Sequence, residues 1–321
     1  MDEHKRLQDR VRELTGWMTI GRTAIIGDTS DPMAVQRGDI IRLQGRDYLI
    51  KGNRYETRFG IGDQPKYWVF SSVDLETGKP LILKTVFYEE FHVHIGVFRM
   101  HCYRDPDKES RVLELTRGDR RFMQGETAYD SVGNNVRVLE YIHGDSLFRS
   151  IYDYSKPHQD YFEHDLGPIL RKLAVCIEAI AHLHQLGTCH GDVRNDHILI
   201  DRDTGEYRWI DFDLNQHVSD FDVWSLGNVI NYVVGNGITS FHEVLRDKHI
   251  PDEVKRSLLP EDGSAFYEYR IMNLGKLYPY LPERLQDIMA HFTIRPKAAY
   301  GSVAELLEDY YEMLDRDFPE K

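Results

Sequence analysis

The chain has 321 residues, of which 53 are acidic and 40 basic, so its formal net charge is −13. This balance argues against a nucleic-acid-binding or anionic-membrane surface, because both need clustered positive charge. Hydrophobic residues make up 41% of the chain and aromatic residues 12%. This is enough apolar material for a sizeable core in one large domain or in two lobes.

The cysteines Cys102, Cys176 and Cys189 are odd in number and show no paired spacing. That pattern indicates free thiols in a reducing compartment. The first twelve residues are charged and unlike a secretory signal, and no apolar run approaches the length of a membrane span. We therefore expect a cytoplasmic protein that binds neither nucleic acid nor membrane, while its oligomeric state stays open.

The first part of the chain is predicted to be mainly β. Residues 4–17 should form an amphipathic helix with Leu7, Val11 and Leu14 on one face, followed by a turn-rich connector. Strand patterns then cover 40–43, 48–50, 67–70, 81–83, 122–129 and 136–141. One helix, over 106–116, interrupts these strands after an Asp-Pro-Asp start signal.

After Gly144 the pattern becomes helical. Apolar residues recur at three- and four-residue spacing through 169–180, which predicts a buried helix face. Further helices are expected over 221–234, 281–292 and 302–314. The predicted fold is α+β, with a small antiparallel β lobe carrying one helix over 39–143 and a larger helical lobe over 144–321. Residues 1–38 would either cap the small lobe or dock another chain.

Two short loops between apolar runs carry acidic residues. Residues 190–197 read His-Gly-Asp-Val-Arg-Asn-Asp-His, and residues 209–213 read Trp-Ile-Asp-Phe-Asp. Phosphoryl transfer needs such a pair, because one carboxylate orients the attacking hydroxyl and another holds Mg²⁺ on the nucleotide. Taken alone, each aspartate could equally be a turn former or a strand-end residue.

The two loops resemble the H-R-D-x-x-x-x-N and D-F-G segments of protein kinases. Residues 179–187 are similar to the helix before that loop, 222–227 to the D-V-W-S-L-G signature, and 139–144 to the hinge between the lobes. By the order and spacing of these segments, over roughly 48–315, the chain is identified as a member of the protein-kinase-like superfamily. The resemblance implies a bilobal fold that uses ATP and Mg²⁺ (or Mn²⁺).

In the large lobe the resemblance implies a role for several residues. Asp192 takes the catalytic-base position, and Arg194 would neutralise the transferred phosphate. Asp211 would bind Mg²⁺. Asp222 would accept hydrogen bonds from the backbone of the catalytic loop, and Trp224 would fill the core of the lobe.

In the small lobe Lys84 matches the strand lysine that holds the α- and β-phosphates. Its partner carboxylate would be Glu109, with Glu114 as the alternative. The remaining nucleotide contacts are two glycines of a phosphate-covering loop and the hinge backbone that meets the adenine: Gly60, Gly62, Glu140 and Ile142. The loop lacks the third glycine of the family pattern, since Pro65 and Lys66 occupy that stretch.

The loop at 190–197 departs from the family pattern at two positions. His197 stands where the family has its metal-binding Asn, and imidazole is a poor Mg²⁺ ligand but a better Mn²⁺ ligand. Either His197 binds metal, or Asp196 or Asn195 substitutes, or one metal site is lost. Gly191 replaces the Arg of H-R-D, as in aminoglycoside phosphotransferases and choline kinases, so activation-loop phosphorylation is not expected as a control.

The segment after Asp211 is also short. Asp222 follows Asp211 after only eleven positions, which leaves no room for a long activation segment ending in A-P-E. Asp213, in place of the D-F-G glycine, is either a further metal-side carboxylate or a solvated loop acid. Much of a peptide-docking platform is therefore expected to be missing.

The function expected from these residues is an ATP-dependent phosphotransferase that transfers the γ-phosphate to a hydroxyl acceptor, a protein serine or threonine in the first place. Two alternatives stay open. One is a pseudokinase that acts as a nucleotide-binding scaffold, because His197 and the incomplete glycine loop depart from the family. The other is a small-molecule kinase similar to aminoglycoside or choline kinases.

Overall fold

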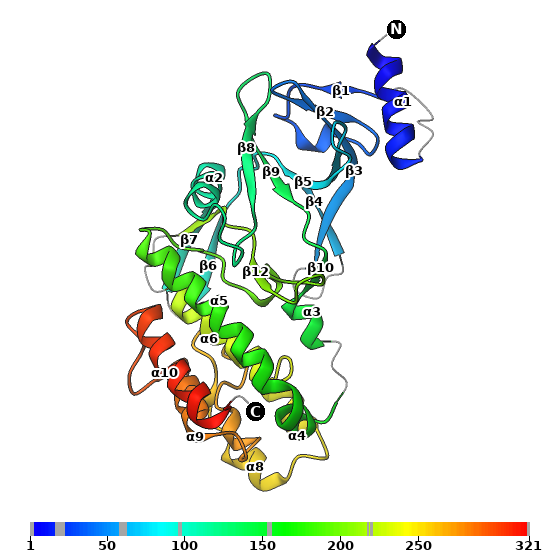
Figure 1. Ribbon diagram of the computed structural model, residues 1–321. Helices are drawn as coiled ribbons and strands as arrows, with labels where there is room; N and C mark the ends of the chain where they lie inside the picture. Colours follow the sequence, from blue (N-terminus) through cyan, green and yellow to red (C-terminus); the bar gives the residue numbers. More distant parts are fainter. Residues whose placement is uncertain are drawn as a thin grey trace. The chain divides into compact units, whose positions relative to one another are not determined.

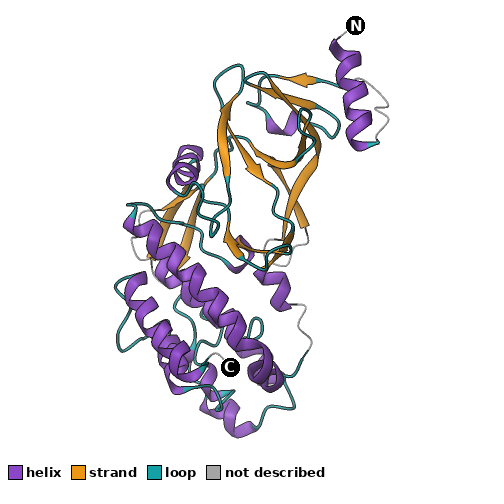
Figure 2. Ribbon diagram, in the orientation of Figure 1, coloured by secondary structure: helices purple, strands orange, loops and turns teal. Residues whose placement is uncertain are grey.

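The computed structural model describes residues 3–16, 23–57, 63–95, 98–152, 156–216, 218 and 221–319. The chain forms two compact units with an α+β composition. The first unit comprises Met1–Glu89, Arg104–Asp119 and Met123–Ile142, and the second comprises Glu90–Tyr103, Arg120–Phe122 and His143–Lys321. The first unit is mainly β and the second mainly helical, as the sequence predicts (Figures 1 and 2).

The first unit is built on one sheet with the strand order β1-β2-β3-β4-β5-β9-β8. Its strands are β1 (Ile25–Ile26), β2 (Ile40–Leu43), β3 (Arg46–Thr57), β4 (Asp63–Asp74), β5 (Pro80–Lys84), β8 (Gly125–Tyr129) and β9 (Asn135–Glu140). All neighbours pair antiparallel except β1 and β2. The strands expected over 40–83 and 122–141 are thereby confirmed.

Helix α1 (Glu3–Thr15) packs against one side of this sheet. Leu7 and Val11 are buried in a cluster with Ile40 and Leu49, and Leu14 packs at its margin. The amphipathic pattern is therefore used inside the unit, because burying these apolar side chains stabilises the helix on the sheet. Of the two expectations for this segment, α1 follows the first and caps the β unit.

Helix α2 (Pro106–Leu115) begins as the sequence predicts. The Asp105 side chain accepts hydrogen bonds from the backbone N–H groups of Asp107 and Lys108, and proline occupies the first helical position. Val112 and Leu113 face the core. Glu109 lies in sequence between the capping residue Asp105 and these apolar residues. Because α2 is oriented by its cap and its apolar face, Glu109 is also buried.

The second unit is organised around α5 (Gly167–Gln185), α6 (Phe221–Val234) and α10 (Val303–Asp317). Helix α5 contacts both α6 and α10 (Figure 1). The helices expected over 169–180, 221–234, 281–292 and 302–314 are confirmed as α5, α6, α9 (Glu283–Ala290) and α10. The shorter helices are α3 (Leu147–Tyr152), α4 (His158–Tyr161), α7 (Phe241–Arg246) and α8 (Asp252–Ser257).

Two small sheets in the second unit were not expected from the sequence. One has the order β10 (Gly144–Ser146), β11 (Ile198–Asp201), β12 (Tyr207–Trp209), and the other β13 (Leu214–Gln216), β7 (Phe98–Arg104), β6 (Glu90–Ile95). The β6–β7 hairpin belongs to the second unit because Met100 and Cys102 pack in a buried cluster with Leu214. The chain last passes between the units at Ile142–His143; the domain limits proposed from sequence stay a prediction.

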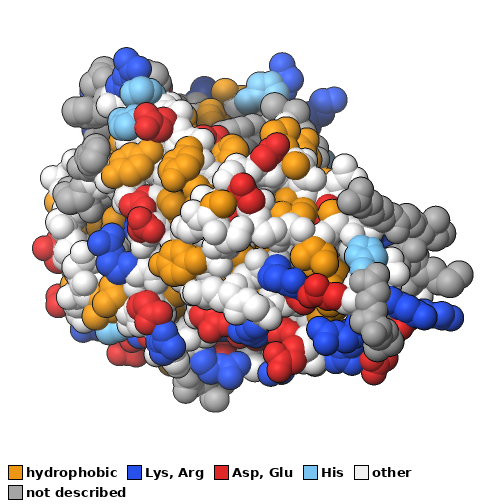
Figure 3. Space-filling model, turned by 90° about the horizontal axis from the view of Figure 1, so that it is seen from above, with side chains coloured by type: hydrophobic (Ala, Val, Ile, Leu, Met, Phe, Trp, Pro, Cys, Tyr) orange, Lys and Arg blue, Asp and Glu red, His pale blue; other side chains and the backbone are white. Residues whose placement is uncertain are grey.

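The surface shows no segregation of charge on the face drawn in Figure 3. Acidic, basic and hydrophobic side chains are interspersed over the described part of that face. None of the helices in the described ranges joins the length and the hydrophobicity needed to cross a membrane. The three cysteines are free thiols, and Cys102 and Cys176 are buried.

A buried carboxylate links an early loop to the β8–β9 turn in the first unit. Asp130 accepts hydrogen bonds from the Thr29 backbone N–H at 2.7 Å and its hydroxyl at 2.9 Å, and from Asn134. Burial raises the pKa of Asp130, but these hydrogen bonds outweigh it and lower the pKa from 3.8 to about 2. The ionised form therefore stabilises the fold.

We expect Asp130→Asn to remove about 2 kcal/mol of pH-dependent stability. A depressed carboxyl pKa contributes stability above the unfolded value of 3.8 that is lost as the pH falls through about 2. Urea unfolding at several pH values between 6 and 2 measures it, with the exposed Asp28→Asn in the same region as control. An unchanged pH profile in Asp130→Asn would contradict the assignment.

Candidate functional site

The predicted site residues lie in both units. Lys84 and Glu109 belong to the first unit, and Asp192, His197 and Asp211 belong to the second. Each half has its own local geometry, which is set by the element that carries it.

In the first half Lys84, at the end of β5, forms an ion pair with Glu109 of α2. The Lys84 Nζ lies 2.9 Å from the Glu109 Oε1, and both side chains are buried. Glu114, the alternative partner, is exposed and pairs with Arg117 instead. The structure therefore joins Lys84 to the first of the two carboxylates considered.

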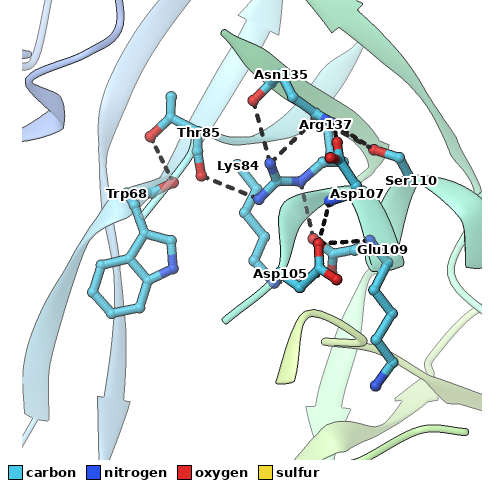
Figure 4. Close-up of polar contacts among 10 residues, drawn as sticks. Trp68, Lys84, Thr85, Asp105, Asp107, Glu109, Ser110, Asn135 and Arg137 are labelled. Carbon is cyan, nitrogen blue, oxygen red and sulfur yellow. Dashed lines mark hydrogen bonds and ion pairs between the residues drawn. The ribbon is translucent and has the colours of Figure 1, made fainter. Parts of the chain in front are cut away.

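Arg137 on β9 is a third member of this half that sequence reasoning missed. Its Nε lies 3.0 Å from the Glu109 Oε2, so that Glu109 binds one cation with each oxygen (Figure 4). Arg137 lies between two valines in β9. An alternating pattern of this kind predicts a strand and gives no sign of a functional side chain. The signal that could have found it is the charge itself, since a buried strand rarely carries an arginine without a carboxylate partner.

The other nucleotide contacts predicted in the first unit are Gly60, Gly62, Glu140 and Ile142. Gly60 and Gly62 lie outside the described residues. Glu140 ends β9, and its backbone N–H donates to the Gln124 carbonyl while its carboxylate accepts from the Gln124 N–H. Ile142 is buried at the end of the unit. The adenine contacts proposed for Glu140 and Ile142 stay a prediction.

In the second half the loop 190–197 is held by Asp222, in the first turn of α6. Its carboxylate accepts hydrogen bonds from the backbone N–H groups of His190 and Gly191, both at 2.8 Å, and lies 3.0 Å from the His184 Nε2. The role expected for Asp222 is confirmed. Gly191 has φ +83°, a conformation that glycine adopts without strain.

His197 connects Asp192 to Asp211. Its Nδ1 lies 2.9 Å from the Asp192 backbone oxygen, and its Nε2 lies 3.5 Å from the Asp211 Oδ2. A carbonyl oxygen only accepts, so Nδ1 is the donor. In the neutral ring Nε2 then presents a lone pair, and this buried atom has no hydrogen-bond partner among the described residues.

Arg194 and Asp196 form a forked ion pair beside Asp192. The Arg194 Nε donates to Asp196 Oδ1 at 2.9 Å, and its Nη2 donates to Oδ2. The Nη1 lies 4.0 Å from the Asp192 Oδ2. The guanidinium is thus fixed next to the Asp192 carboxylate.

Asp211 has an unusual backbone conformation. Its φ is +71°, in the left-handed region that few residues other than glycine and asparagine or aspartate adopt. Such strain in a loop is held in place by its surroundings and is common at functional sites. Asp213 is buried, so it is not the solvated loop acid that sequence allowed as one alternative.

Trp224 corrects one expectation. It is only half-buried, and it packs at the surface of α6 against Phe266 and Phe292. The fully buried tryptophan of this unit is Trp209, whose Nε1 donates to the Cys176 carbonyl. The reason is that the turn of α6 that carries Trp224 faces a segment that covers it, and not the inside of the unit.

That covering segment, residues 264–270, lies next to the loop of Asp192. Phe266 packs on Phe221 with ring centroids 5.4 Å apart, one residue before the Asp222 that holds the loop. Burial raises the pKa of Tyr267, while the positive charges of Arg270 and Arg194 lower it. The segment therefore borders the loop that carries Asp192 and Arg194.

A cavity of about 570 Å³ in the second unit lies away from these residues. It is bordered by α9 and α10 and lined mainly by charged side chains, among them Asp262, Arg284 and Asp309. None of the predicted site residues lines it.

The curated proteins to which this chain is similar include protein kinases. The chain is 36% identical over 188 residues to the serine/threonine-protein kinase AtPK1/AtPK6 of Arabidopsis thaliana, covering 58% of this chain and 36% of that protein. It is 30% identical over 142 residues to human myosin light chain kinase family member 4, covering 36% of this chain and 35% of that protein. The matches thus span about a third of these relatives' length.

Among solved structures, the kinase domain of Mycobacterium tuberculosis PknI aligns with a TM-score of 0.48 at 14% identity, covering 87% of this chain and 99% of that one. No family model matches the chain.

Proposed function

Because this chain belongs to the protein-kinase-like superfamily, we propose that it is an ATP-dependent phosphotransferase that moves the γ-phosphate to a hydroxyl group. The observation that supports this most directly is the His197 ring, which lies between the backbone of Asp192 and the carboxylate of Asp211. Phosphoryl transfer needs one carboxylate at the acceptor hydroxyl and one at the metal. The imidazole lies between the two loops that carry these carboxylates.

We infer that the acceptor is a serine or threonine hydroxyl of a protein. The named relatives are a serine/threonine-protein kinase and a myosin light chain kinase family member, which supports this class. The ten residues between Asp211 and Asp222 favour the second candidate, a small hydroxyl compound, because they leave little platform for a peptide. The two kinds of acceptor can be separated by measuring ADP release. One assay contains a serine/threonine peptide library, and the other contains an aminoglycoside or choline.

In this proposal each site residue has one role, either at the acceptor hydroxyl or at the nucleotide. Asp192 directs the acceptor hydroxyl at the γ-phosphate, and Arg194 neutralises the oxygens that are transferred. Lys84, oriented by Glu109, holds the α- and β-phosphates. The glycines Gly60 and Gly62 and the backbone of Glu140 and Ile142 complete the nucleotide contacts.

The residues present fit a divalent cation. The His197 Nε2 and the Asp211 Oδ2 lie 3.5 Å apart, and a cation or a proton between them would satisfy both atoms; the described residues contain no group of three or more such side chains. A bound Mg²⁺ or Mn²⁺ would neutralise charge on the phosphates. Because one donor is nitrogen, the pair favours Mn²⁺ over Mg²⁺.

We expect ATP with Mn²⁺ to raise the melting temperature more than ATP with Mg²⁺. A ligand that binds only the folded state at 100 times its Kd stabilises that state by about 2.7 kcal/mol. Asp211→Asn should abolish the metal-dependent part of this shift. His197→Asn, which supplies the oxygen donor of the family pattern, should reverse the preference toward Mg²⁺.

The exposed Asp203→Asn, in the turn between β11 and β12, serves as the control and should behave as the unchanged protein does. No melting shift with any metal would contradict the proposed function and favour a scaffold that works without nucleotide. A shift without ADP release would favour a nucleotide-binding pseudokinase. An unaltered metal preference in His197→Asn would show that a proton, and not a metal, lies between His197 and Asp211.

A further inference from the structure

The environment of Glu109 contains more positive charge than its pairing with Lys84 requires. Lys84 and Arg137 are directly opposite each other on the antiparallel strands β5 and β9. Opposite residues on such strands point to the same face with Cβ atoms about 5 Å apart, and like charges there repel. A carboxylate between them removes this conflict, and Glu109 supplies it from α2.

Arg137 holds Glu109 without help from Lys84. Its guanidinium is buried, with its Nη2 donating to the Thr85 carbonyl at 3.1 Å and its Nη1 donating to the Asn135 carbonyl at 3.2 Å (Figure 4). These acceptors lie at the end of β5 and the start of β9. The planar guanidinium is therefore fixed to the sheet independently of its contact with the Glu109 Oε2, which lies 3.0 Å from its Nε.

Asn135 extends this connection to the helix itself. Its Nδ2 donates to the Ser110 hydroxyl at 2.9 Å and to the Asp107 carboxylate at 3.1 Å. Helix α2 is thus tied to β9 at three positions: Asp107, Glu109 and Ser110. All of these contacts lie within the first unit.

We propose that Arg137 is a positioning residue that keeps α2, and with it Glu109, engaged at Lys84 whether or not nucleotide is bound. The proposal rests on the proposed function, because it concerns how Lys84 is readied for the phosphates. It explains how a chain with little room for an activation segment assembles this half of the site.

Two variants separate Arg137 from Lys84. Lys84→Met leaves Glu109 paired with the fixed guanidinium, so α2 should stay in place. Arg137→Met removes the link from Glu109 to Thr85 and Asn135, so α2 should open more often. If nucleotide binds only the engaged form, the apparent Kd for ATP rises by the inverse of the engaged fraction, whereas kcat at saturation changes little.

The experiment is hydrogen exchange of the α2 amides in the nucleotide-free full chain, together with ATP titration. We expect Arg137→Met to speed α2 exchange about tenfold or more and Lys84→Met to change it less than about twofold. Arg137→Met should raise the KM for ATP and leave kcat near that of the unchanged protein. Arg137→Lys, which keeps the charge but loses the fork, should restore part of the protection.

Arg111→Met is the matched control, since it makes the same substitution on the exposed face of the same helix. If Arg137→Met does not fold by circular dichroism, Arg137→Gln carries the comparison. The proposal is overturned if the Arg137 variant exchanges like Arg111→Met, or if Lys84→Met loosens α2 as much. The hydrogen-exchange measurement does not depend on turnover. A chain that never releases ADP would contradict the proposed function, and the exchange rates of α2 would still test the role of Arg137.

Discussion

Asp192→Asn is expected to lower kcat for phosphoryl transfer by about 10²–10⁴-fold, the usual contribution of a positioned general base. The side chain has the same shape, but an amide cannot accept the proton of the acceptor hydroxyl. The Asp192 carboxylate is partly exposed, with Arg194 at 4.0 Å and the His197 Nδ1 at 3.6 Å. Its loss should therefore change the unfolding free energy by less than about 1 kcal/mol.

The measurement is single-turnover ADP formation at saturating ATP and metal, with Asp203→Asn as the control for an Asp-to-Asn change elsewhere in the same unit. Because Arg194 is bound to Asp196 independently of Asp192, binding of ATP should be retained in the variant. Full turnover by Asp192→Asn would remove this residue from the mechanism. Loss of ATP binding together with turnover would indicate a structural effect instead.

Asp222→Asn is expected to have the largest effect on stability, about 3 kcal/mol. The buried carboxylate accepts from two backbone N–H groups, those of His190 and Gly191, and faces the His184 ring. An amide has only one acceptor oxygen, so its NH₂ group would face a donor. The loop would be released, and activity should fall with stability.

This effect should depend on pH. Burial raises the pKa of Asp222, but the His184 hydrogen bond, the nearby histidine charges and the Gly191 N–H together lower it below the ordinary 3.8. Its contribution is therefore present above about pH 4 and is lost as the pH falls through the native pKa. Urea unfolding at pH 7 and at a series of pH values below 4 should show the difference between the two proteins becoming smaller as the pH falls. Equal midpoints at pH 7 would refute the role of Asp222.

Local signals explain the parts that were predictable. The Asp-Pro start of α2, the apolar spacing of α5 and the acidic residue that opens α6 depend on neighbours within one helix. Short-range capping and periodicity are visible in any stretch of sequence. Glu109 could be chosen over Glu114 on the same basis, because the helix face that carries Val112 and Leu113 also carries Glu109.

The β6–β7 hairpin and the half-burial of Trp224 could not be predicted in this way. The hairpin is assigned to the second unit by contacts of Met100 and Cys102 with Leu214, more than a hundred positions away. Trp224 meets Phe266 and Phe292, which also come from distant segments. Neither partner can be inferred from periodicity, which reports only that a residue will be buried against something.

The sequence alone determined which chemical groups this protein has: a strand lysine, a helix glutamate, two loop aspartates and a histidine in place of an asparagine. Only the tertiary structure decided how they are paired. Arg137 reaches Glu109 because β9 lies beside β5 in one particular register, and His197 faces Asp211 because two loops meet. Strand register and loop contact are set by the sum of many distant packing interactions, and no single segment of the chain encodes them.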